Sequence, residues 1–103
     1  MGKKYNIKTL PSFANDLDEV IGYIINELSN PIAAEHLLIE MNSKLKTLSI
    51  LPKIYKKYVP KIKRKYIYYK LKVKKYSMFY SIHGNTVILR RFLYSKRDFE
   101  NLL

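Results

Sequence analysis

The chain has 103 residues, no cysteine, and 20 lysines and arginines against 8 acidic residues, which gives a net charge of +12. This length suits one domain, residues 1–103, and the absence of cysteine excludes disulfides and thiolate metal sites. No apolar run is long enough to cross a bilayer, so we expect a cytoplasmic protein without a membrane partner. Because 48% of the residues are hydrophobic, a packed core is expected despite the charge.

The charge is distributed unevenly along the sequence. Between Met41 and Arg97 there are seventeen basic residues and no acidic one, and all eight acidic residues lie outside that segment. An AT-rich genome would explain the abundance of lysine, tyrosine, isoleucine and asparagine, but it would not explain this segregation. A field of one sign concentrates phosphate-bearing partners, so the segment predicts a polyanionic partner.

The first two elements are predicted to be a strand and a helix. Residues 5–10 alternate between apolar and polar side chains, which is typical of a strand, and Pro11 ends it. Ser12 is the expected N-cap of a helix over residues 13–28. The helix has one apolar stripe, formed by Phe13, Leu17, Val20, Ile21, Ile24 and Leu28.

A second helix is predicted to follow almost at once. Asn30 can cap it, and Pro31 fits the first helical position, where a missing N–H costs nothing. The apolar stripe continues to Leu51, and Pro52 closes the helix. Because the break between the two helices is short, we expect an antiparallel helical hairpin.

The second half of the chain changes to strand periodicity. Residues 53–65 are very basic and contain Pro60, so we expect a connecting loop or a ragged strand edge. Residues 66–75 alternate with period two. The face predicted to be basic holds Tyr66, Tyr68, Lys70, Lys72 and Lys74, and the other holds Ile67, Tyr69, Leu71, Val73 and Lys75.

Two more strands complete the prediction. Residues 76–82 and 86–94 are rich in apolar and aromatic side chains, and His83, Gly84 and Asn85 form a hairpin turn between them. Residues 97–103 could form a short C-terminal helical turn. The order β-α-α-β-β-β defines an α+β fold, with the helical hairpin packed on one face of a small, mainly antiparallel sheet.

Five stretches in this order resemble the RelE/ParE superfamily of bacterial type II toxins, also described as plasmid stabilisation proteins. They are residues 16–24, 30–34, 48–52, 74–80 and 87–103. The resemblance implies a growth-arresting toxin that is held harmless by a cognate antitoxin encoded beside it. It implies one of two targets: mRNA on the ribosome, cut as RelE-like toxins do, or DNA gyrase, inhibited as ParE-like toxins do. Neither activity implies a cofactor or a small-molecule substrate.

The catalytic residues of the RelE branch are only partly present. Lys70 matches the second of two alternating strand lysines, and Arg97 matches an arginine just past the last strand, so these two are the candidate catalytic residues. Tyr68, Ser77 and Leu103 stand where that branch would have the first lysine, a strand arginine and a tail tyrosine. Metal-free RNA cleavage needs a base, a cation at the phosphate and an acid, so an endoribonuclease would have to complete this set from other residues.

The basic strand and its surroundings supply candidate nucleic-acid contacts. They are Arg64, Tyr66, Tyr68, Lys72 and Lys74, which combine phosphate-binding cations with rings on which unpaired bases can stack. The alternative is a solvated sheet face with harmless lysines. If the chain lacks toxicity, these residues would make it a non-catalytic basic nucleic-acid-binding protein, an inactive member of the family.

Three further expectations concern charged residues. Arg90 and Arg91 are adjacent in a strand and point to opposite faces, so one of them should have a structural partner such as Asp16, Asp18 or Glu27. The two histidines are too isolated to predict a metal site. An antitoxin that covers the basic face is expected to be acidic, with an affinity that falls as salt is added.

Overall fold

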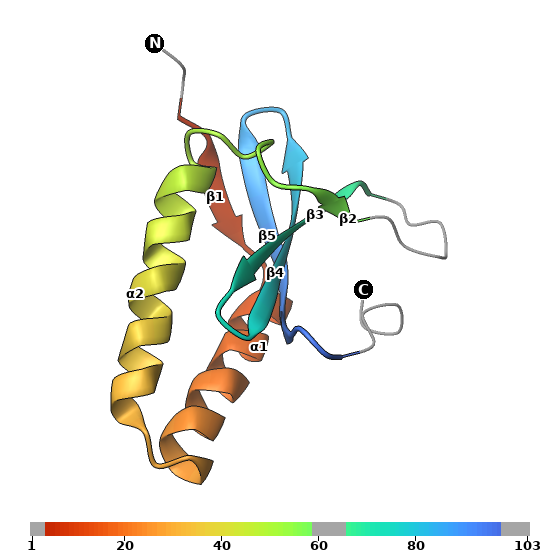
Figure 1. Cartoon of the computed structure of the whole chain (residues 1–103). Coiled ribbons are helices and arrows are strands. Elements are labelled where there is room, and N and C mark those ends of the chain that lie inside the picture. Colours follow the sequence, from red (N-terminus) through yellow and green to blue (C-terminus); the bar gives the residue numbers. More distant parts are fainter. Residues whose placement is uncertain (1–3, 59–65, 98–103) are drawn as a thin grey trace.

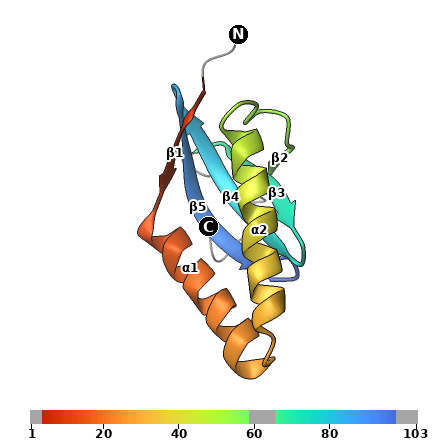
Figure 2. The same ribbon diagram turned by 90° about the vertical axis from the view of Figure 1, so that its left-hand side faces the viewer.

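The computed structural model describes residues 4–58 and 66–97 of the chain, and it has two layers. Two helices lie together on one side of a five-stranded sheet, and their tip extends beyond the end of the sheet (Figures 1 and 2). The predicted α+β architecture is therefore confirmed. Arg64 and the predicted C-terminal helical turn lie outside the described residues, apart from Arg97 itself.

The sheet has the strand order β1-β5-β4-β3-β2. Its strands are β1 (Asn6–Thr9), β2 (Lys57–Tyr58), β3 (Tyr68–Val73), β4 (Tyr76–His83) and β5 (Thr86–Tyr94). The first strand pairs parallel with β5, and all other neighbours are antiparallel. The two-residue β2 is the ragged edge expected within residues 53–65.

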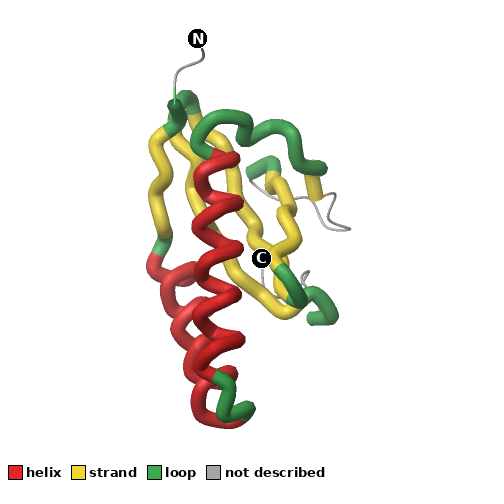
Figure 3. The backbone as a smooth tube through the Cα atoms, turned by 60° about the vertical axis from the view of Figure 1, so that its left-hand side comes forward, coloured by secondary structure: helices red, strands yellow, loops and turns green. Residues whose placement is uncertain are grey.

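The helical layer consists of α1 (Pro11–Gly22), a π-helical turn η1 (Tyr23–Glu27) and α2 (Pro31–Leu48). Figure 3 shows them as a hairpin of two adjacent helices. The expected cap of α2 is confirmed, because Asn30 Oδ1 accepts a hydrogen bond from the N–H of Ala33 at 3.1 Å. The expected cap of α1 is wrong: that helix begins at Pro11, and Ser12 Oγ instead donates to the carbonyl of Arg90 at 2.7 Å.

The core lies between the helices and the sheet. It is built from buried apolar side chains of both layers: Phe13, Ile24, Ala34, Leu37, Met41, Leu48, Tyr69, Leu71, Val73, Met78, Tyr80, Val87, Leu89 and Phe92. Within β3 the core residues are Tyr69, Leu71 and Val73, so the alternate residues Lys70 and Lys72 belong to the opposite face. We call this second face, which the helices do not cover, the bare face.

Tyr80 shows how the core also satisfies a polar group. Its side chain is fully buried, and its hydroxyl donates to the carbonyl of Pro52 at 2.6 Å. Burial, with smaller contributions from Tyr55 and Tyr69, raises the pKa of Tyr80. The loop that follows α2 is thereby tied to the centre of the sheet.

The edge of β5 is closed by α1. Because β1 pairs with residues 86–89 of β5, no described strand pairs with the rest of that edge. Asp16 of α1 takes its place: Oδ2 accepts the N–H of Phe92 at 3.0 Å, and its carboxylate receives two hydrogen bonds from the Arg91 guanidinium at 2.6 and 2.9 Å. The prediction of a structural partner for one of the paired arginines is confirmed.

Candidate functional site

The bare face carries most of the candidate residues that the structure describes. Strand β3 contributes Tyr68, Lys70 and Lys72 to it, and Phe79 of β4 pairs with Lys70 there. Phe79 and Leu93 are buried on this face beneath Tyr58, whose ring meets that of Phe79 edge-on at 5.4 Å. Because Phe79 and Tyr68 are buried, this face offers a partner mainly the lysines of β3 and the partly exposed Tyr58.

Arg90 adds a cation to this face that sequence reasoning did not assign to a site. Its guanidinium carbon lies 4.4 Å from the centre of the Tyr66 ring and 5.7 Å from that of Tyr68, and its Nη1 donates to Ser81 Oγ at 3.4 Å. The strand register explains the placement. It changes from Phe79 opposite Arg91 to Tyr80 opposite Leu89, so Arg90 is the extra residue of a β-bulge.

The bulge has no clear sequence signal. Consecutive arginines predict opposite faces, but the choice between them depends on where the register changes and on the position of Asp16. An arginine that can lie over the rings of Tyr66 and Tyr68 would have indicated the bare face for Arg90. The sequence does not reveal this contact unless the strand register is already known.

Lys74 does not lie with Lys70 and Lys72. Strand β3 ends at Val73, and Lys74 occupies the following turn with a positive φ of 54°. Its backbone N–H donates to Glu40 Oε2 at 3.1 Å, and its Nζ lies 3.5 Å from Glu40 Oε1. Because Glu40 is in α2, the expected grouping of Lys74 on the basic face is wrong: it reaches toward the helical layer.

Ser77 occupies the place where the RelE branch would have an arginine. Its side chain is fully buried, and its hydroxyl lies 3.0 Å from Ser95 Oγ. A serine here carries no positive charge, and its buried hydroxyl is already hydrogen-bonded to Ser95, so it cannot replace the phosphate-binding arginine of the RelE branch. The position therefore contributes packing and a local hydrogen bond.

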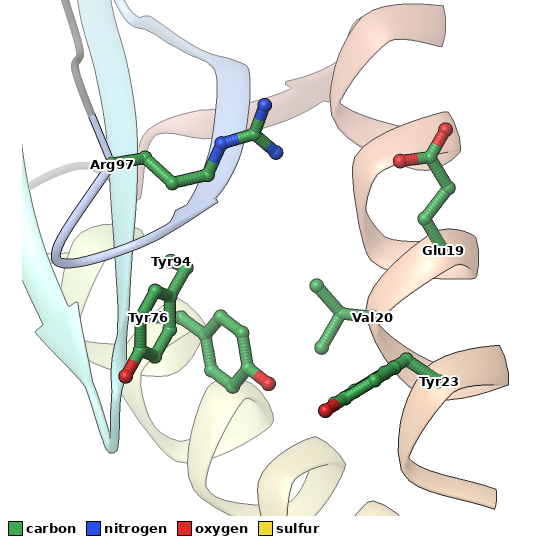
Figure 4. Close-up of a pocket in the computed structure, with 6 residues that line it drawn as sticks. All are labelled: Glu19, Val20, Tyr23, Tyr76, Tyr94 and Arg97. Carbon is green, nitrogen blue, oxygen red and sulfur yellow. The ribbon is translucent and has the colours of Figure 1, made fainter. Parts of the chain in front are cut away.

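Arg97 lies away from the bare face and lines a cavity of about 340 Å³ between α1 and the end of the sheet (Figure 4). Val20 and Glu19 of α1 and Tyr23 of η1 form one side, and Tyr76 and Tyr94 form the other. The Tyr76 ring stacks on Phe92 at 5.3 Å and meets Tyr94 edge-on at 5.9 Å. Burial, then the neighbouring phenols of Tyr23 and Tyr94, raise the pKa of Tyr76.

The two candidate catalytic residues therefore lie on opposite sides of the sheet. Lys70 is on the bare face beside Phe79. Arg97 lines the cavity with Val20 and Tyr23 on the helical side. To act together in catalysis, both cations would have to contact the same substrate phosphate. The structure places them on different sides of the sheet, so they do not form one site.

The described residues lack a metal-binding cluster and a membrane-spanning helix. They contain no group of three histidine or carboxylate side chains placed to hold a metal ion. Among the same residues, no helix has the length and apolar character that crossing a bilayer requires.

Fold and site together define a small, strongly basic α+β domain in which a helical hairpin covers one sheet face and leaves the other to cations and aromatic rings. A family model described as the ParE toxin of type II toxin-antitoxin system, parDE, matches residues 7–99. The chain belongs to the ParE toxin family.

Comparison with one solved structure supports the fold. A structure titled "Chromosomal ParDE TA system from P. aeruginosa" superposes with a TM-score of 0.67 at 15% identity, covering 88% of this chain and 96% of that one. A crystal structure of a copper-bound mutant toxin from Helicobacter pylori gives a TM-score of 0.49 at 18% identity, covering 88% of this chain and 94% of that one. None of the curated proteins matches the sequence.

Proposed function

We propose that this toxin arrests growth by inhibiting DNA gyrase, and that a cognate acidic antitoxin restrains it. The observation that carries the choice of target is the separation of Lys70 and Arg97 by the sheet. Metal-free RNA cleavage requires its acid, base and cation around one phosphate. With Ser77 buried as well, the positions that match the RelE branch do not form such a cluster.

The tip of the helical hairpin is the surface that we assign to the protein target. Its exposed apolar side chains include Leu28 and Ile32, which are 55% and 63% exposed. From Tyr23 to Ile32 the only charged residue is Glu27. An apolar tip with one acidic residue suits a protein surface better than a polyanion or an acidic antitoxin.

The test is a supercoiling assay with purified gyrase and relaxed plasmid, run beside a purified translation reaction in which new mRNA 5′ ends are mapped. We expect inhibited supercoiling and intact mRNA. Ribosome-dependent cuts with unaffected gyrase would reject the gyrase target and establish an endoribonuclease. Salt-sensitive binding of RNA or DNA without either activity would indicate the non-catalytic binding protein.

Two sets of variants connect the assay to the structure. Lys70→Ala with Arg97→Ala should retain gyrase inhibition and growth arrest, whereas loss of toxicity in this double variant would support RNA cleavage. Ile32→Ser should weaken inhibition of gyrase at least about tenfold, as loss of a central interface anchor does. Ile67→Ser is the matched control, because Ile67 is equally exposed, at 64%, but lies before β3.

One observation keeps mRNA cleavage as the second candidate. Lys70 and Lys72 lie at alternate positions of β3 on the bare face, where their cations would contact the phosphates of a single strand. The same cations are the expected contacts of the acidic antitoxin. Its affinity for this toxin should fall as salt is added, and a salt-independent affinity would contradict that placement.

A further inference from the structure

A cavity of about 560 Å³ lies where β3 begins and β4 ends. Its volume is within the range of about 300–1,000 Å³ that small ligands occupy in proteins. Lys53, from the loop after α2, lines it together with Tyr66, Tyr69, Ser81 and His83. This cavity is separate from the Arg97 cavity and from the hairpin tip.

The walls of the cavity combine a ring with hydrogen-bonding and cationic groups. His83 meets the Tyr66 ring edge-on at 5.2 Å, and its Nε2 lies 2.9 Å from Ser81 Oγ. Arg90 lies over the same Tyr66 ring at 4.4 Å and donates to the same Ser81 hydroxyl at 3.4 Å. These contacts hold the aromatic wall and its cation in one arrangement before a ligand arrives, which lowers the entropic cost of binding.

The charge around the cavity selects for an anion. Lys53 is exposed and lines the cavity, and Arg90 lies directly behind the Tyr66 wall. None of the described residues that line it is acidic. A flat ring, a hydroxyl, an imidazole and two cations complement a nucleobase joined to a phosphate.

We propose that this cavity binds one nucleotide unit of a single-stranded nucleic acid, with the base against Tyr66 and the adjoining phosphate at Lys53. A single strand fits better than a duplex, because only an unpaired base can enter a concave site. The net charge of +12 would attract the neighbouring phosphates and thereby favour a strand over a free mononucleotide. This binding is independent of the proposed action on gyrase.

The experiment measures fluorescence anisotropy of a labelled single-stranded RNA of about ten nucleotides, and of the same sequence as DNA, a length that typical single-strand sites accommodate. The full chain is titrated in parallel with three variants: Lys53→Gln, Tyr66→Leu and the control Lys75→Gln. Both lysine variants have the same net charge, and Lys75 is exposed in the turn between β3 and β4, at the opposite end of these strands from the cavity. Circular dichroism checks that each variant is folded.

We expect Tyr66→Leu to weaken binding about tenfold, as removal of a stacking ring does. Lys53→Gln should weaken it about fivefold and lower the slope of log affinity against log salt by about 0.7, the value for one lost phosphate contact on a single strand. Lys75→Gln should change affinity less than about twofold, because its charge lies at the other end of β3 and β4 from the ligand.

Equal losses in Lys53→Gln and Lys75→Gln would overturn the proposal, because binding would then depend on net charge alone. Unchanged affinity in Lys53→Gln would overturn the proposal as well. Because Lys53 is an exposed loop residue, this variant should fold normally, and the test does not require the protein to tolerate a change in its core. Inhibition of gyrase should be unaffected in Lys53→Gln, so the two proposals can fail separately.

Discussion

Two consecutive arginines, Arg90 and Arg91, lie in different surroundings at the bulge of β5. Arg91 reaches over the strand edge to the carboxylate of Asp16, which also accepts the N–H of Phe92. Arg90 turns to the bare face and lies over the ring of Tyr66. The guanidinium of Arg91 fastens α1 to the sheet, and that of Arg90 stands beside a cavity that can admit a ligand.

This difference separates a charge that holds the two layers together from a charge that we propose to act in ligand binding. The helices and the sheet bury their apolar residues against each other, and at the edge of β5 the partly buried Arg91 and Asp16, 25% and 11% exposed at their side chains, are paired. On the bare face the cations lie over rings or along β3. A mutation on one side should therefore change stability, and a mutation on the other should change binding.

The test with the largest expected effect replaces each of the two arginines by glutamine in separate variants; Arg91 is considered first. We expect Arg91→Gln to lower the free energy of unfolding by about 2 kcal/mol, because it leaves the Asp16 carboxylate without its charged hydrogen-bonding partner at a partly buried edge. The measurement is urea denaturation followed by circular dichroism. Asp18→Asn, in an exposed acid of the same helix, is the control and should cost less than about 0.5 kcal/mol.

A second prediction concerns the buried hydroxyl of the helical side. Tyr80→Phe should lower the free energy of unfolding by about 1.5 kcal/mol, because it leaves the Pro52 carbonyl without its donor. Tyr94→Phe, at an exposed ring, should have almost no effect. Equal losses in both variants would show that the Tyr80 hydrogen bond contributes nothing specific.

The same residue predicts a pH dependence. Since burial raises the pKa of Tyr80 above that of a tyrosine in the unfolded chain, its contribution to stability is complete below about pH 10 and is lost as the pH rises further. The wild-type chain should therefore lose more stability between about pH 9 and pH 11 than Tyr80→Phe does. Parallel urea titrations at the two pH values measure this difference, and identical slopes would contradict it.

The fold was predictable from the sequence because its signals are local. Alternating apolar residues predicted β3, and the Asn30–Pro31 start predicted α2, whose cap has the expected geometry. The prediction that Ser12 caps α1 was wrong because its hydroxyl instead donates to a tertiary partner, the carbonyl of Arg90. That contact depends on strand β5, which lies far away in the sequence.

The candidate site was less predictable because it depends on register and turns. Alternation placed Lys70 and Lys72 on one face, but the turn at Lys74 interrupts the pattern and directs that lysine to Glu40. The bulge that exposes Arg90 arises from pairing between β4 and β5. Tertiary pairing of this kind has no signature in a single segment.

On the bare face itself, Arg90→Gln should cost stability only modestly, by about 0.5–1 kcal/mol, because it removes a cation over a ring and one long hydrogen bond. The loss of binding free energy for a single strand should be larger than this loss of stability, because Tyr66 loses the cation that lies over its ring. Arg90→Lys keeps the charge and loses the flat guanidinium, so it should recover part of the binding. A loss of stability as large as that of Arg91→Gln would remove the distinction between the two faces.

The smallest effect is expected at the turn between the two regions. Lys74 and Glu40 form an ion pair whose side chains are 46% and 36% exposed, so solvent and salt screen it. Lys74→Gln should lower the free energy of unfolding by less than about 0.5 kcal/mol, and added salt should erase that difference. Single-strand binding should also change little, because this lysine is directed toward α2 rather than toward the bare face. Urea denaturation at two salt concentrations and the anisotropy titration test both statements; a binding loss equal to that of Lys53→Gln would place Lys74 among the ligand contacts after all.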